Sequence, residues 1–177
     1  MIDHEATTNA LSEYIGTPCA LVRVPARGRR KSSKTLGRDI VTQGDDGYPV
    51  TVVSIEALDA FNDWLRERGQ HYPDYCVERF RQDSVIQADM KEDGIPFENV
   101  ARQIHIGDAI LERAKLCTRC SMIEVNPRTG EVDYPGLSKL LREYCRGLGY
   151  EDPVMSSNYL VRSPGTIMIQ EKCIFDM

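Results

Sequence analysis

The chain has 177 residues, 41% of them hydrophobic, and a formal net charge of −5 at pH 7, which is typical of one globular domain with a sizeable core. The pI near 5.3 argues against nucleic acid as the main partner, and no stretch reaches the roughly 18 apolar residues that a membrane span needs. Because the acidic start does not resemble a secretory signal, we expect a soluble cytoplasmic protein with no membrane partner and mostly reduced cysteines.

The first predicted element is a short amphipathic helix over residues 7–15. Thr8 is expected to cap it, and Gly16 is expected to end it. The stretch CALVRV (19–24), which is rich in apolar and β-branched residues, then predicts a strand.

Residues 25–47 are polar and contain several glycines, so they predict a long loop with one short strand over 39–42. The basic run RVPARGRRKSSK (23–34) overlaps the start of this loop. Its charge and hydrogen-bond donors suit a phosphate group, but a solvated charged loop explains the same composition.

The stretch YPVTVVSIEALDAFNDWLRERG (48–69) changes from an apolar strand to an amphipathic helix. Ser54 is the predicted N-cap, and acidic residues follow it in the first turn. The apolar face of this helix is expected to consist of Leu58, Phe61, Trp64 and Leu65.

Many short apolar runs follow, separated by turn residues. Strands are predicted over residues 84–88, 102–106, 108–116, 121–125, 158–162, 166–169 and 173–177. Gly107 and Asp108 predict a tight turn between two of them, and a second helix is predicted over 137–144. Since strands and helices do not alternate, we expect a mainly β protein with helices (α+β), built on a curved sheet or barrel.

The segment ERFRQD (78–83) places two arginines on either side of Phe80. In an extended chain Arg79 and Arg81 would both point to the face opposite Phe80. This arrangement predicts either an anion site or salt bridges to surface carboxylates.

The motif CTRC contains Cys117 and Cys120 with Arg119 between them. A structural zinc site is disfavoured because no second pair of ligands has suitable spacing. A redox dithiol is disfavoured because the motif continues a strand-like run. Two readings stay open, either small buried packing residues or a thiolate ligand for a soft metal, favoured by the neighbouring cation.

Several segments in a fixed order resemble the MOSC domain, the C-terminal module of molybdenum cofactor sulfurase, in the branch of the mitochondrial amidoxime reducing component and its bacterial relatives. The segments are DDGYPVTVVSIEALDAFN, ERFRQD, IPFENVARQIHIGDAIL, CTRCSMIEVNPRTGEV and SPGTIMI. They match family turns, a Ser-initiated helix, an Arg-Phe-Arg segment and a Cys-x-Arg-Cys motif. The resemblance covers roughly residues 11–177 and implies a MOSC-type β-barrel.

The resemblance implies a site for the molybdenum cofactor (molybdopterin). In the family the second cysteine of Cys-x-Arg-Cys is the metal ligand, and the matching residue here is Cys120, which is also the implied catalytic residue. The other residues implied to bind the cofactor are Thr118, Arg119, Arg81, Asp83, Gly47 and Tyr48. No role for Cys117 is implied.

The implied activity is the two-electron reduction of small N-oxygenated substrates, such as amidoximes, hydroxylamines and N-hydroxycytosine. Molybdenum would cycle between oxidation states VI and IV while the protein positions the cofactor. An external electron-transfer protein of ferredoxin or cytochrome type is expected, because the chain has no further cysteine cluster for an iron–sulfur centre. Pyridoxal phosphate binding is also associated with the family.

Family members of this branch carry an N-terminal barrel domain whose Lys-Ser segment closes the other side of the cofactor pocket. We expect a single MOSC domain over residues 1–177, with residues 1–10 flexible and that N-terminal barrel domain absent. Asp83 also stands where the family has asparagine. These departures raise three alternatives: a non-catalytic carrier of cofactor or sulfur, a remnant without cofactor, and a homodimer in which a second chain completes the pocket.

Overall fold

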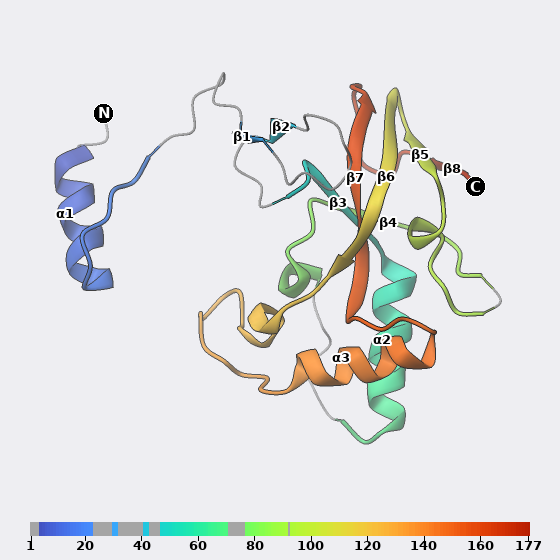
Figure 1. The fold of residues 1–177 in the computed structure, drawn as a ribbon, viewed down its shortest axis with the longest axis horizontal. Coiled ribbons are helices and arrows are strands. Elements are labelled where there is room, and N and C mark those ends of the chain that lie inside the picture. The colour runs from blue at the N-terminus through green and yellow to red at the C-terminus, as the bar shows by residue number, and fades with distance from the viewer. Residues whose placement is uncertain (1–3, 23–29, 32–40, 43–46, 71–76, 92) are drawn as a thin grey trace.

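The structure is a computed structural model that describes residues 4–22, 30–31, 41–42, 47–70, 77–91 and 93–177 (Figure 1). Its helices are α1 (His4–Ile15), α2 (Ile55–Glu67) and α3 (Leu137–Gly147), with 3-10 turns η2 (Val77–Phe80), η3 (Phe97–Asn99) and η4 (Ser121–Glu124). Its strands are β1 (Arg30–Lys31), β2 (Val41–Thr42), β3 (Val50–Ser54), β4 (Ser84–Ile86), β5 (Gln103–Ile106), β6 (Ala109–Thr118), β7 (Val154–Ser163) and β8 (Cys173–Asp176).

Six of the strands form one mixed sheet in the order β4-β3-β7-β6-β5-β8. Only β3 and β4 pair in parallel, and every other pair in this sheet is antiparallel. The sheet curls into a half-barrel, which confirms the predicted α+β fold with a curved, barrel-like sheet (Figure 1). The short strands β1 and β2 pair separately.

The long strands β6 and β7 form the spine of the sheet, and their pairing is irregular at three places. The register shifts after Ile110, after Arg113 and after Cys117. Such irregularities increase local twist and bend a strand pair. They therefore supply the curvature of the half-barrel, and the last of them lies at the start of the cysteine motif.

The sheet has an apolar core on each face, because successive side chains of a strand point to opposite sides. Val53 of β3 belongs to the core that α2 and α3 cover, which also contains Phe61 and Leu141. The adjacent residue Val52 belongs to the second core, inside the curl of the sheet, with Tyr159.

Helix α2 begins as the sequence predicts. The Ser54 hydroxyl accepts a hydrogen bond of 3.2 Å from the amide of Ala57, which is a standard N-cap. Leu58, Phe61 and Leu65 are buried and Trp64 packs against them, so the predicted apolar face is confirmed. The predicted second helix is α3, which ends at Gly147.

The turn between β5 and β6 depends on two glycines. Gly107 has a φ of 54°, a left-handed conformation that favours glycine, and confirms the predicted tight turn. Gly165 passes so close to this turn that a Cβ atom there would lie 2.3 Å from the carbonyl carbon of Asp108. The segment after β7 therefore lies directly against the β5–β6 hairpin.

Two predictions near the N-terminus need correction. Helix α1 begins at His4, so Thr8 lies inside the helix and does not cap it. The described part of the predicted strand 19–24, Cys19–Val22, has no regular secondary structure, and none of the described strands pairs with it. Most of the predicted loop 25–47 and of the basic run 23–34 lies outside the described residues, except for β1, β2 and Gly47.

Two further predicted strands are wrong. Residues 121–125 form η4 followed by a single bridge residue, and residues 166–169 are not in a strand. The amide of Ile123 bonds instead to the carbonyl of Cys120, which closes the 3-10 turn directly after β6. No helix among the described residues is long and apolar enough to cross a membrane.

Candidate functional site

Cys120 lies where the chain leaves the sheet. Thr118 is the last residue of β6, and Cys120 is the N-cap residue of η4, with both side chains exposed. Between them, the backbone amide of Arg119 donates a hydrogen bond of 2.8 Å to the carbonyl of Pro153. This bond continues the β6–β7 pairing by one residue, and the chain leaves the sheet directly after it, at the exposed Cys120.

The side chain of Arg119 connects the two arginine-containing motifs. Its Nη1 donates to the Cys117 sulfur at 3.1 Å, and its Nη2 donates to the carbonyl of Phe80. The tertiary structure therefore brings CTRC and ERFRQD together. Cys117 is half-buried, whereas Cys120 is exposed.

The Phe80 carbonyl also accepts a hydrogen bond of 3.0 Å from Nε2 of Gln82. Two other polar atoms beside this carbonyl, Arg119 Nε and Gln82 Oε1, are buried and have no hydrogen-bond partner among the described residues. A donor and an acceptor without partners thus belong to the two residues whose side chains bond to the Phe80 carbonyl.

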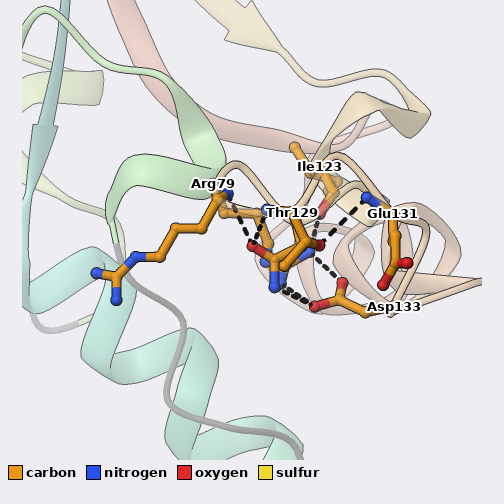
Figure 2. A network of polar contacts seen from close by, with 7 residues as sticks. Arg79, Ile123, Thr129, Glu131 and Asp133 are labelled. Carbon is orange, nitrogen blue, oxygen red and sulfur yellow. Dashed lines mark hydrogen bonds and ion pairs between the residues drawn. The ribbon is translucent and has the colours of Figure 1, made fainter.

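Arg79 differs from the prediction made for it. The segment 77–80 forms η2 and is not extended, so Arg79 is buried together with Phe80 and does not share an exposed face with Arg81. Its guanidinium binds the carboxylate of Asp133 through two hydrogen bonds of 2.9 and 3.1 Å, as Figure 2 shows. For this residue the salt-bridge alternative is the correct one.

The same ion pair organises the loop that follows η4. Nη1 of Arg79 also donates to the carbonyl of Ile123 at 3.2 Å. The side chain of Asn126 donates to Asp133 at 2.8 Å, and its oxygen accepts from the amide of Arg128 at 2.8 Å. Hydrogen bonding to Arg79 lowers the pKa of Asp133 below its ordinary value, so the pair stays charged.

Arg81 and Asp83 have different surroundings. Arg81 is exposed and has a left-handed φ of 50°, which is uncommon for a residue with a side chain. The Asp83 carboxylate accepts hydrogen bonds from the amide and hydroxyl of Thr51, at 2.8 and 2.7 Å. Asp83 therefore joins the start of β4 to β3, while Arg81 presents a cation at the surface.

Gly47 and Tyr48 lie further from the cysteine motif. Tyr48 is buried, and the ammonium of Lys115 lies 5.3 Å from the centre of its ring. Lys115 is on β6, three residues before Thr118, which corresponds to roughly 10 Å along a strand. Sequence reasoning missed this exposed cation, which the alternating pattern of β6 could have indicated.

Sequence reasoning also missed Glu98, a fully buried carboxyl group in η3. One of its oxygens, Oε1, accepts hydrogen bonds from the amide and hydroxyl of Ser54, at 2.8 and 2.9 Å. Burial raises the pKa of Glu98 above its ordinary value. The only sequence signal was an acidic residue directly after Phe97 in an otherwise apolar segment.

Within the described ranges, no group of three or more His, Cys, Asp or Glu side chains could hold a metal ion. A zinc site of four protein ligands therefore has no support in this part of the chain. The exposed thiol of Cys120 suits a metal that brings most of its own ligands.

Comparison with known proteins gives a consistent picture. The family model described as MOSC domain matches residues 39–172. The mouse protein "Mitochondrial amidoxime-reducing component 1" is 27% identical over 161 residues, which cover 85% of this chain and 44% of that protein. "Molybdenum cofactor sulfurase" of Drosophila grimshawi is 36% identical over 80 residues, 44% of this chain and 10% of that protein. The Caenorhabditis elegans protein of the same name is 40% identical over 68 residues, 37% of this chain and 9% of that protein. The chain therefore spans less than half the length of these relatives.

Proposed function

The chain belongs to the MOSC domain family, and from this premise we propose that it binds molybdenum cofactor and reduces N-hydroxylated compounds with electrons from a separate donor protein. The observation that carries the proposal is the exposed Cys120 thiol, which directly follows Arg119, the residue whose guanidinium bonds to the carbonyl of Phe80. The name of the mouse relative, an amidoxime-reducing component, supplies the substrate class.

The residues present fit such a cofactor. Cys120 offers a soft sulfur ligand that nothing among the described residues covers or bonds. The exposed cation of Arg81 suits a phosphate group, and the exposed hydroxyl of Thr118 lies next to the ligand. The unsatisfied buried atoms of Arg119 and Gln82 suit a ring that carries both a donor and an acceptor.

When bound, the cofactor would supply a metal centre that exchanges two electrons and an oxygen atom. The chain's own residues would orient it. Arg119 sets the position of the Cys120 backbone through its bond to Pro153, and its guanidinium anchors that turn to Phe80. The Asp83 carboxylate is held by two hydrogen bonds from Thr51 on β3, which fix its position at the start of β4.

The proposal is tested by producing the chain in a host that makes molybdenum cofactor. We expect near-stoichiometric molybdenum and pterin in the wild type, loss of molybdenum in Cys120→Ser, and reduction of an amidoxime by the wild type with an artificial electron donor. Cys117→Ser is the matched control and should keep its molybdenum. Metal retained in Cys120→Ser, or absent from a folded wild type, would overturn the assignment.

A second candidate function is a carrier that holds sulfur on Cys120 for transfer to another protein. The similarity to two proteins named molybdenum cofactor sulfurase favours it, as does the exposure of this thiol. A persulfide on Cys120 in the mass spectrum of the intact protein, without amidoxime reduction, would support the carrier. Pyridoxal phosphate binding, the kind of electron donor and the cytoplasmic location stay predictions.

A further inference from the structure

A groove of about 770 Å³ lies along one side of the half-barrel, and none of the residues that line it belongs to the site around Cys120. One wall consists of the six consecutive residues 84–89, which contain β4. The other wall consists of residues 167–173 together with Phe175, which lead into and form part of β8. A groove lined by two continuous chain segments suits an extended polypeptide.

Both walls are edges of the sheet. Among the described residues, β4 pairs only with β3, and β8 pairs only with β5. Edge strands present backbone donors and acceptors that can bind a further strand. Ile86, Ile106 and Phe175 give the groove an apolar lining, so an added strand would also bury side chains there.

The rim of the groove is apolar and is held in place. Ile167, Met168 and Ile169 are all exposed, and Ile169 is 97% exposed. The segment that carries them is anchored at one end, where the amide of Asp108 donates to the carbonyl of Thr166. Three exposed apolar side chains in a row mark a contact surface.

The same chain contains an apolar segment whose sequence favours a strand but which pairs with none of the described strands. Residues 4–22, which we call the arm, consist of α1 and the segment Cys19–Val22. The Ser12 hydroxyl joins the two, because it donates to the carbonyl of Cys19 and accepts from its amide, both at 3.0 Å. Leu21 and Val22 are 52% and 77% exposed, although their sequence favours a strand.

We propose that Cys19–Val22 of one copy adds as a strand in the groove of a second copy, so that the protein forms an arm-exchanged dimer. The arm lies at the left of Figure 1, whereas β5 and β8 lie at the right, so the arm extends away from its own groove. If identical chains exchange their arms, the exposed segment Cys19–Val22 and the groove of each chain are both covered, and no other protein is needed.

Charge also favours this occupant. Three carboxylates, those of Glu56, Asp89 and Glu171, line the groove together with the single cation of Lys172. The sequence that follows the arm carries six positive residues between positions 23 and 34. The groove is acidic, and the sequence that directly follows Cys19–Val22 is basic, so the two have complementary charge.

The first test is the mass of the full chain in solution, measured by size-exclusion chromatography with light scattering. We expect twice the chain mass of 20.0 kDa for the wild type and a single chain mass for both Leu21→Asp and Val85→Arg, which alter the arm and the groove wall. The control Val132→Asp changes an exposed valine outside the groove and should stay dimeric. A monomeric wild type, or dimeric arm and groove variants, would overturn the proposal.

The second test shows which copy supplies the arm. Equal amounts of ordinary and heavy-nitrogen-labelled protein are mixed and treated with a flexible thiol cross-linker, since Cys19 is in the arm and Cys173 lines the groove. Cross-linked Cys19–Cys173 peptides that combine the two labels are expected. Random exchange would make about half of these peptides mixed, so a complete absence of mixed peptides would show that the arm binds its own groove, contrary to the exchange. Neither test depends on cofactor content or activity.

Discussion

Arg79 and Asp133 are 54 positions apart in the sequence, yet their side chains meet in a two-pronged ion pair beside the Cys120 turn. Arg79 is only 6% exposed, so the carboxylate is the partner that allows this cation to be buried. The pair ties η2 to η4 and to the loop that follows it. The pair therefore holds the segment that contains Phe80 against the segment that follows Cys120.

We predict that Asp133→Asn destabilises the fold, because it removes a negative charge that is paired with a buried guanidinium. The midpoint of urea unfolding should fall clearly. Asp152→Asn, which removes the partner of an exposed pair with Arg142 at 3.9 Å, is the control and should change the midpoint little. Equal shifts of the midpoint in the two variants would show that the Arg79–Asp133 pair does not stabilise the fold more than an exposed pair does.

Acid should weaken the same pair. The pKa of Asp133 is lowered in the folded protein, so its contribution to stability is present above its ordinary pKa of 3.8 and is lost as the pH falls through the lowered value. The pH dependence of unfolding in Asp133→Asn should therefore be flatter than that of the wild type below the ordinary pKa. The same pH dependence in both proteins below this pKa would contradict the prediction.

Glu98 is expected to act in the opposite direction. Burial raises its pKa above the ordinary 4.5, so its contribution to stability is complete below that value and falls as the pH rises through the raised one. Glu98→Gln should remove this decline while keeping an acceptor for Ser54, and Glu131→Gln on the exposed loop should not. Urea unfolding across a pH series is the measurement, and a decline that persists in Glu98→Gln would refute the assignment.

Gly165→Ala tests the contact between the segment after β7 and the β5–β6 turn. The new Cβ would lie 2.3 Å from the Asp108 carbonyl carbon, so the backbones must separate, at a cost of about 3 kcal/mol. Gly147→Ala, at the end of α3, meets no atom within 4 Å and should be neutral or stabilising by up to about 1 kcal/mol. Calorimetric or urea unfolding of both variants gives the comparison.

Thiol alkylation should separate the cysteines. Burial raises the pKa of Cys145 to about 11, and its sulfur donates to the carbonyl of Val154, so only about one molecule in a thousand carries its thiolate at pH 8. Cys120 is exposed and should be labelled by iodoacetamide well before Cys145. Peptide mass spectrometry over time measures this order, and the reverse order would contradict the described burial.

The sequence by itself determined the elements whose local signals agree. The Ser54 cap with the apolar face of α2 and the Gly107 turn depend on residues a few positions apart, so a linear pattern contains them. The ordered motifs also predicted the family. The choice of Cys120 came from the family motif, and the structure adds that its thiol is exposed.

Only the tertiary structure decided the rest. The predicted extended conformation of residues 77–80 was wrong, as were the predicted strands at 121–125 and 166–169 and the described part, 19–22, of the one at 19–24. A short apolar run becomes a strand only where a neighbouring strand can pair with it. No local pattern indicates that Arg79 meets Asp133 or that Arg119 reaches Phe80. These contacts join distant segments through the curl of the sheet, which exists only when the whole chain is folded.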